Sequence, residues 1–459
     1  MRGMGKLAIL PLLAVGLSTL ASCVDEKIVF RDRELFEDPL TEAGSFLGYT
    51  SAEDKLTVCG NCHVGPQSEW EETAHASAWD GLQASGGAQA FCEGCHTVSE
   101  MGNAVTVAAG HNATGEERYR DVQCESCHGP GLTHVTDPSD ATVPMAQMAI
   151  LDATSDPTLG CAQCHSGDHH PFANEWAESA HGSVNAYPAG RSECEACHTG
   201  EGALAAFGVN TIYTEQMDVA LDGNHLPITC AVCHDPHGSD FTAQLRFPID
   251  APSEDANLCM KCHQKRGQPD PTSSRGPHSP EGPTLLGTAG WWPPDFTGPF
   301  VSTHGSLEEN PRLCAGCHVN SFEVTDEVTG DFVFSATGHR FEATPCVDAQ
   351  GVPTAGPCAN SEKTYEACTD CHSATVAEQL VDQAETSVAP LIAQLQALVD
   401  DVEMNMPTEF DTSDSRYTVA EGSKFNLGLA EAAGAVVHNP FLIRALLNAS
   451  ISAMQDEYP

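Results

Sequence analysis

Apolar residues recur at helical spacing near the carboxyl end of this 459-residue chain. The spacing predicts a helix over residues 376–404, with a kink or break at Pro390, from the positions of Leu380, Val388, Leu391, Leu395 and Leu398. A second helical stretch covers about 425–454 and is interrupted at Pro440, with Asn439 as a candidate N-cap. We therefore expect a C-terminal helical pair over residues 373–459. A purely structural role and a functional one both remain open for it.

The other apolar run lies at the amino end, over residues 7–20, after the basic residues Arg2 and Lys6. This arrangement predicts an export signal, and the run is too short for a typical membrane span. It ends in Leu-Ala-Ser-Cys at position 23, which resembles a bacterial lipobox. We expect a lipoprotein signal peptide over residues 1–22 and a lipid-carrying Cys23. An ordinary signal peptide with an incidental Cys23 is the alternative.

Between the two ends the apolar pattern is weak. Residues 24–58 are rich in charge, and we interpret them as a tether. Residues 59–372 hold nine C-x-x-C-H motifs, numbered here motif 1 to motif 9, with loops rich in Gly and Pro between them. The predicted fold class is therefore mainly α with extensive irregular loops and sparse secondary structure.

C-x-x-C-H is the attachment signature of a c-type haem, in which the thiols bond to the porphyrin and the histidine binds iron. A zinc site, which also uses C-x-x-C pairs, is the alternative, but zinc does not require a histidine directly after the second cysteine. We expect nine haem c groups. The attachment cysteines would be Cys59, Cys62, Cys92, Cys95, Cys124, Cys127, Cys161, Cys164, Cys194, Cys197, Cys230, Cys233, Cys259, Cys262, Cys314, Cys317, Cys368 and Cys371, and the iron-binding motif histidines His63, His96, His128, His165, His198, His234, His263, His318 and His372.

The first six motifs form an internal duplication. Motifs 1 and 4, and motifs 2 and 5, are each 102 residues apart, and motifs 3 and 6 are 106 apart. The pairs Trp70 with Trp176 and His75 with His181 also repeat at 106 residues. We expect two three-haem modules over residues 59–240 and three further haems over residues 241–372. A third copy of the module is a possibility that the wider spacing leaves open.

Each haem iron needs a second axial ligand, and twelve histidines lie outside the motifs. Their local contexts favour nine as distal ligands, with His111, His169 and His170 in reserve. The nine are His75, His134, His181, His225, His237, His278, His304, His339 and His438.

These motifs resemble the bacterial multihaem c-type cytochromes with paired C-x-x-C-H motifs, including cytochrome c554-like and decahaem electron-conduit proteins. The end of the chain, with His438-Asn439-Pro440, is similar to the terminal helix of multihaem nitrite and hydroxylamine enzymes. The resemblance covers about residues 59–450, and it implies that His438 binds a haem. It differs from the nitrite reductases, which carry one Lys-ligated haem, because every motif here ends in His.

Three cysteines lie outside the motifs, and two of them, Cys346 and Cys358, are expected to form a disulfide in an exported protein. A labile thiol pair is the alternative. The net charge of −44 argues against a nucleic-acid partner and favours basic or cationic ones.

The predicted function is electron transport by an outer membrane lipoprotein on the periplasmic or cell-surface face. Its partners would be redox proteins or extracellular electron acceptors. A homo-oligomer or filament is one version of this function. A multihaem oxidoreductase that acts on a small nitrogen or sulfur compound at one open haem is the alternative.

Overall fold

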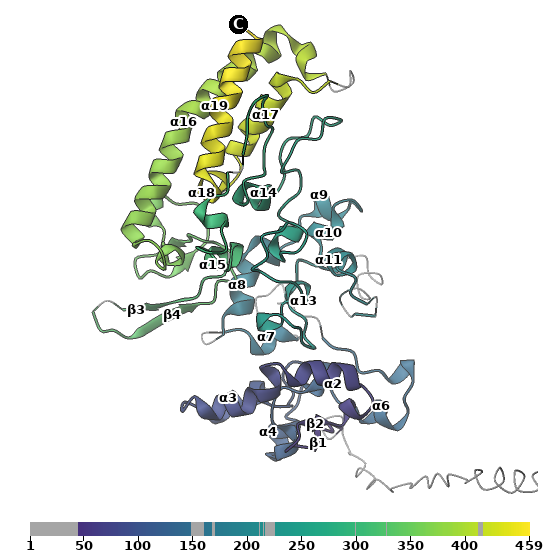
Figure 1. Cartoon of the computed structure of the whole chain (residues 1–459). Coiled ribbons are helices and arrows are strands. Elements are labelled where there is room, and N and C mark those ends of the chain that lie inside the picture. Colours follow the sequence, from purple (N-terminus) through teal and green to yellow (C-terminus); the bar gives the residue numbers. More distant parts are fainter. Residues whose placement is uncertain are drawn as a thin grey trace, which may run out of the picture. The chain divides into compact units, whose positions relative to one another are not determined.

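The computed structural model describes residues 45–147, 160–167, 170–210, 212–213, 215, 225–298, 300–326, 328–411 and 416–459. The predicted signal peptide 1–22, the candidate lipid site Cys23 and His169 lie outside these residues. Within them, most elements are short helices joined by irregular chain, and strands are few (Figure 1). The expectation of a mainly helical, loop-rich fold with sparse strands is confirmed.

The region of motifs 1–3 is built from short elements. They are β1 (Tyr49–Ser51), β2 (Leu56–Thr57), η2 (Cys59–Asn61), α2 (Val64–Glu71), η3 (His75–Ser77), α3 (Ala78–Ala84), η4 (Ala90–His96), α4 (Gly110–Thr114), η5 (Glu117–Tyr119), α5 (Cys124–His128), α6 (Leu132–Thr136) and η6 (Asp140–Thr142). The region of motifs 4–6 contains α7 (Cys161–Cys164), α8 (Phe172–Glu178), η7 (Ala180–Gly182), α9 (Ala186–Ala189), α10 (Glu195–His198), α11 (Gly200–Ala206), α13 (Cys230–Cys233) and η8 (Thr242–Gln244).

Motifs 7–9 follow with η9 (Cys259–Lys261), α14 (Glu281–Leu285), η10 (Thr303–Gly305), α15 (Cys314–His318), β3 (Phe322–Thr325), β4 (Phe332–Ala336), β5 (Cys346–Val347), β6 (Pro353–Thr354), η11 (Asn360–Glu362) and η12 (Glu366–Cys368). The strands of the described residues pair as antiparallel hairpins, β1 with β2, β3 with β4 and β5 with β6. Cys346 in β5 forms a disulfide with Cys358.

The longest helices lie at the carboxyl end, namely α16 (Ala374–Asn405), α17 (Val419–Ala430) and α19 (Pro440–Glu457), with η13 (Pro407–Phe410) and α18 (Ala435–His438) between them. Helices α16 and α17 both pack against α19 (Figure 1). Their shared core includes Leu395, Leu429, Leu442 and Leu447, which are almost fully buried. This is the largest apolar cluster among the described residues, so the helices have their own core.

The caps of these helices agree with the sequence. The side chain of Asn439 accepts a hydrogen bond from the Leu442 N–H at 3.0 Å, and Pro440 takes the first turn of α19. Of the two outcomes expected at Pro390, a kink or a break, the break does not occur, because α16 continues through this residue. The expected second helix is divided into α17, α18 and α19. Among the described helices, none combines the length and apolar character that a membrane crossing requires.

The expected tether over residues 24–58 also differs in its last part. Residues 45–58 are folded, and Phe46 and Leu47 are only 2% and 3% exposed. The backbone N–H groups of Leu47 and Gly48 donate hydrogen bonds to the Glu125 carboxylate at 2.8 Å. The sequence predicted a tether because the segment is rich in charge and its short apolar stretch shows no periodicity.

The duplication expected from the sequence is present in the hydrogen bonds. The Trp70 indole N–H donates to the Val122 carbonyl at 2.8 Å, and the Trp176 indole N–H donates to the Ile228 carbonyl at 2.7 Å. The carbonyls of the repeated histidines, His75 and His181, each accept from the N–H of those same two residues at 3.1 Å. Each indole therefore fixes a buried turn that ends at a repeated histidine.

Candidate metal centres

Seven of the nine motif histidines lie opposite a second imidazole from elsewhere in the chain. The ring centroids are 5.9–6.4 Å apart in all seven pairs. The pairs, motif histidine first, are His63 with His134, His128 with His237, His165 with His75, His198 with His278, His234 with His339, His263 with His181, and His318 with His438.

This separation fits a metal ion between two imidazoles. A metal–imidazole bond is about 2 Å long, and adding the radius of each ring puts the two centroids roughly 6 Å apart. Direct stacking of two rings would allow a closer approach. The residues present therefore fit an iron bound by two histidines, and the neighbouring C-x-x-C thiols could carry its porphyrin.

Backbone carbonyls orient several of these rings through Nδ1. His128 bonds the Pro144 carbonyl at 2.8 Å, His234 the Ala243 carbonyl at 2.7 Å, and His318 the Phe341 carbonyl at 2.8 Å. When Nδ1 donates a proton to a carbonyl, the lone pair is on Nε2, which is then the nitrogen available to a metal. The chain therefore selects both the tautomer and the direction of each ring.

Burial favours the neutral form that a metal requires. Desolvation lowers the pKa of His165, His181 and His438 to about 4 in each case. It also lowers the pKa of His75 and His128. These imidazoles are neutral at pH 7 and can each donate a lone pair.

Two motif histidines, His96 and His372, face no imidazole from the described residues. Two of the nine expected distal ligands, His225 and His304, face no motif histidine there. His225 Nδ1 bonds the Glu201 carboxylate at 2.6 Å, and His304 Nδ1 bonds the Val437 carbonyl at 3.1 Å.

The two described reserve histidines, His111 and His170, pack against other aromatic rings. His111 packs against Trp79, with centroids 5.0 Å apart, and His170 against Phe172, at 6.5 Å.

Family comparisons agree with the motif chemistry. Residues 58–129 match the family described as cytochrome c554 and c-prime, and residues 225–268 match the doubled CXXCH motif. The chain is a multihaem c-type cytochrome.

Known proteins similar to this cytochrome include the C-type polyheme cytochrome OmcB of Geobacter sulfurreducens, 26% identical over 295 residues. That alignment covers 57% of the cytochrome and 35% of OmcB. The multiheme cytochrome MtrA of Shewanella baltica is 27% identical over 161 residues, which are 32% of this chain and 44% of MtrA. The cytochrome thus aligns with less than half the length of either relative.

A search of solved structures finds the undecaheme cytochrome from the S-layer of Carboxydothermus ferrireducens. The match covers 92% of this chain and 71% of that one, with a TM-score of 0.46 and 17% sequence identity.

Thiols of different motifs lie against one another in the cytochrome. Cysteines within hydrogen-bonding reach link motif 1 to 3, 2 to 4, 4 to 6, 5 to 7 and 7 to 8, through the pairs Cys59 with Cys124, Cys95 with Cys164, Cys161 with Cys230, Cys197 with Cys262, and Cys259 with Cys314.

Motifs 8 and 9 are also neighbours. Burial raises the pKa of Cys317 in motif 8, and the nearby thiols of Cys314 and of Cys371, which belongs to motif 9, raise it further. Each thiol marks the edge of a porphyrin, so neighbouring motifs imply neighbouring porphyrin edges.

Two buried carboxylates position ligand-bearing segments, and sequence analysis missed both. Glu175 accepts hydrogen bonds from the N–H groups of Thr337 and His339 at 2.8 and 2.7 Å. Glu125 accepts from the Gly131 N–H at 2.7 Å, just before the helix that carries His134. Burial raises the pKa of Glu125 to about 7, although its hydrogen bonds oppose the shift. Glu125 lies inside motif 3, and Glu175 lies one residue before a repeated Trp, so both positions offered a signal.

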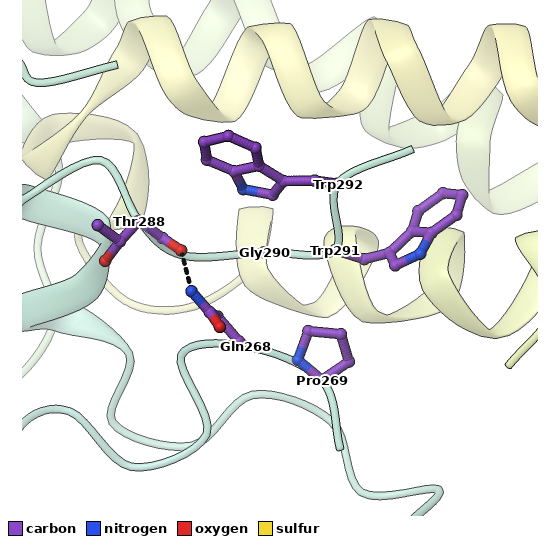
Figure 2. Close-up of a pocket in the computed structure, with 6 residues that line it drawn as sticks. All are labelled: Gln268, Pro269, Thr288, Gly290, Trp291 and Trp292. Carbon is purple, nitrogen blue, oxygen red and sulfur yellow. Dashed lines mark hydrogen bonds between the residues drawn. The ribbon is translucent and has the colours of Figure 1, made fainter. Parts of the chain in front are cut away.

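A cavity of about 370 Å³ lies beside the C-terminal helices. Figure 2 shows its lining, with the side chains of Trp291 and Trp292 pointing in different directions. Trp291 packs closely over Gly422 of α17. The backbone N–H of Trp291 donates a hydrogen bond to the side-chain oxygen of Asn426 at 2.7 Å. No motif histidine is among the residues that line this cavity.

Proposed function

We propose that this protein is an exported nonahaem cytochrome that conducts electrons through a continuous array of bis-histidine haems. The observation that carries the proposal is the set of seven imidazole pairs with centroids 5.9–6.4 Å apart. An iron held between two imidazoles has no open position for a substrate, so its chemistry is limited to electron transfer.

The neighbouring thiols support a continuous path. Every motif has a cysteine close to a cysteine of another motif. With Cys127 near Cys161 joining motifs 3 and 4, and Cys233 near Cys262 joining motifs 6 and 7, the links connect motif 1 through to motif 9. Haems attached at these positions would transfer electrons from edge to edge without a mobile carrier. Redox partners would dock where haems at the ends or sides are exposed, and the acidic surface favours basic or cationic partners.

The proposed location is the outer membrane, through a lipid on Cys23. The motif for this lipid follows an export signal, and several acyl chains anchor a protein firmly. The electron acceptors would then be extracellular or terminal ones.

Voltammetry of the purified holoprotein tests the function. A film on an electrode should give a reversible multi-electron wave at low potential, because bis-histidine ligation lowers the potential relative to Met/His ligation. Addition of nitrite, hydroxylamine or sulfite should leave this wave unchanged. A catalytic current with one of these compounds would contradict the proposal.

The second candidate is a reductase or oxidase of such compounds, and one observation favours it. His96 of motif 2 faces no imidazole from the described residues. Among those residues, a haem iron at motif 2 would therefore have one axial position without a histidine. The ferric EPR spectrum separates the candidates, since the enzyme requires a native high-spin haem and the conduit requires low-spin haems alone.

A further inference from the structure

Three one-turn helices each carry a histidine outside the motifs: His75 in η3, His181 in η7 and His304 in η10. The residues before η7 and η10, Ser179 and Ser302, have the same backbone angles, φ −83° and ψ 165°. The glycine after the histidine, Gly182 or Gly305, lies against a backbone carbonyl of the helix before it. The turn at His304 therefore repeats the turn at His181, and it shares with the turn at His75 a one-turn helix of three residues that includes the histidine.

The chain before each turn is also repeated. After motifs 1, 4 and 7, the carbonyl of the motif histidine accepts a hydrogen bond from the start of the next helix. The donors are the N–H groups of Gln67, Ala173 and Gly282, at 3.0, 2.9 and 2.8 Å. Motif 7 thus begins a third module, although its spacing differs from the first two.

The third module lacks a middle motif. From the turn histidine to the last motif of the same module, 49 residues separate His75 from Cys124 and His181 from Cys230, but only 10 separate His304 from Cys314. Motif 8 corresponds to motifs 3 and 6, because the histidines of all three bond a later backbone carbonyl through Nδ1. Motif 9 is therefore the first motif of a fourth, incomplete module.

The turn histidine has a fixed partner in the first two modules. His75 faces His165 of motif 4, and His181 faces His263 of motif 7, with centroids 6.2 and 6.1 Å apart. In both cases the turn histidine faces the histidine of the first motif in the following module. After the third module, that motif is motif 9.

The surroundings of His304 agree with this partner. Its Nδ1 bonds the Val437 carbonyl, and the next residue, His438, faces His318 of motif 8. The ligands of motifs 6 and 7 are neighbours in the same way, because His339 and His181 both contact the Phe341 ring, at 5.6 and 4.6 Å. Neighbouring ligands belong to neighbouring haems there, and motifs 8 and 9 are neighbours.

We propose that His304 is the distal ligand of the haem attached at Cys368 and Cys371 and bound by His372. The proposal rests on the proposed haem at every motif. It makes no assignment for His225, whose Nδ1 bonds Glu201 and whose Nε2 is therefore the nitrogen available to a metal. The voltammetric test of electron conduction does not depend on which histidine serves motif 9, so the two proposals can fail separately.

The test is ferric EPR of the matured His304→Ala protein. One haem should change from low spin to high spin, and added imidazole should restore the low-spin signal. The matched control is His170→Ala, which removes an exposed imidazole that lies against Phe172 and should keep the native spectrum. Intact mass should show the same haem number in both variants. A fully low-spin spectrum for His304→Ala would overturn the assignment.

A second set of variants identifies the haem. In a protein with Cys368→Ala and Cys371→Ala, which cannot attach the ninth haem, His304→Ala should add no high-spin signal. A new signal in this background would show that His304 serves another haem, and the assignment would be wrong. If His304→Ala does not mature, His304→Met keeps a ligand at the site and should raise the potential of one haem, because Met/His ligation gives higher potentials. Unchanged potentials would also contradict the assignment.

Discussion

The buried carboxylate of Glu175 accepts a hydrogen bond from the backbone N–H of His339, which lies 164 residues further along the chain. The same carboxylate accepts two hydrogen bonds from Thr337, through its N–H at 2.8 Å and its hydroxyl at 2.7 Å. Glu175 lies on α8, in the second module, whereas His339 follows motif 8. One side chain thus joins two distant modules at the place where the His339 ring meets His234.

We predict that Glu175→Ala disturbs the haem of motif 6. Without the carboxylate, the buried N–H groups of Thr337 and His339 lose their acceptor, which costs about 1–3 kcal/mol for each unsatisfied group. The His339 ring should then bind iron less completely. Ferric EPR should show partial high-spin character in one haem, and the thermal unfolding midpoint should fall.

Glu178→Ala on the same helix is the control. The Glu178 carboxylate is about half exposed, and its partner Arg340, which is 11% exposed, has Glu342 as a second acidic neighbour. The change therefore removes one ion pair and leaves the acceptor of the Thr337 and His339 N–H groups in place. If both variants show the same spectrum as the unmutated protein, Glu175 does not position His339.

The turn histidines give a second prediction. His181→Ala should leave the iron at motif 7 five-coordinate or water-bound, and His75→Ala should do the same at motif 4. In each case ferric EPR should gain high-spin intensity from one haem, while the others stay low-spin. A low-spin spectrum for His181→Ala would make that residue structural and would weaken the case for His75.

The haem number is directly measurable. Nine motifs predict nine covalently attached haems, so the intact mass of the mature protein should exceed that of the processed polypeptide by nine haem groups. Changing both cysteines of any one motif should remove one haem group from this mass. Eight haems or fewer in fully matured protein would refute the count.

Glu125 should contribute to stability rather than to electron transfer directly. Its carboxylate accepts hydrogen bonds from the N–H groups of Leu47, Gly48 and Gly131, and all of these bonds are buried. Glu125→Ala should lower stability by at least about 2 kcal/mol, because three buried donors lose their acceptor. The exposed Glu53 provides a control substitution to Ala, which should leave the unfolding midpoint unchanged. Equal midpoints for the two variants would refute the role given to Glu125.

The lipid prediction concerns Cys23. Cys23→Ser should release the protein from the membrane into the soluble fraction, because acylation requires the thiol. Fractionation followed by haem staining measures this release. Unchanged membrane retention would place the anchor elsewhere or make Cys23 incidental.

The sequence was most informative where chemistry requires neighbouring residues. The C-x-x-C-H motifs, the repeated pair of Trp176 and His181, and the cap at Asn439 could all be recognised locally. Helical periodicity also located the C-terminal helices. It failed at Pro390, where a long helix with its own packed face continues despite one lost hydrogen bond.

The pairing of histidines could not be predicted, because it depends on long-range contacts. His237 lies only three residues after His234 but faces His128 of an earlier module. No local pattern indicates such a partner. His225 appeared equivalent to the other candidates, but it faces no motif histidine among the described residues, and its Nδ1 bonds Glu201. Buried acceptors such as Glu175 were missed for the same reason, since the sequence shows a charged helical residue and not its distant partners.

The forward exchange of turn histidines has a consequence for how this protein can lengthen or shorten in evolution. Because His75 faces His165 of motif 4 and His181 faces His263 of motif 7, a deletion that removes a turn histidine would leave the first motif of the next module without its imidazole. Insertion of a complete module at a boundary keeps every turn matched with a following motif. The first site closes within its own module through His134, and the site at His318 closes through His438 of the carboxyl-terminal helices. Neither of these two sites depends on a turn histidine from another module, so the number of whole modules between them can change.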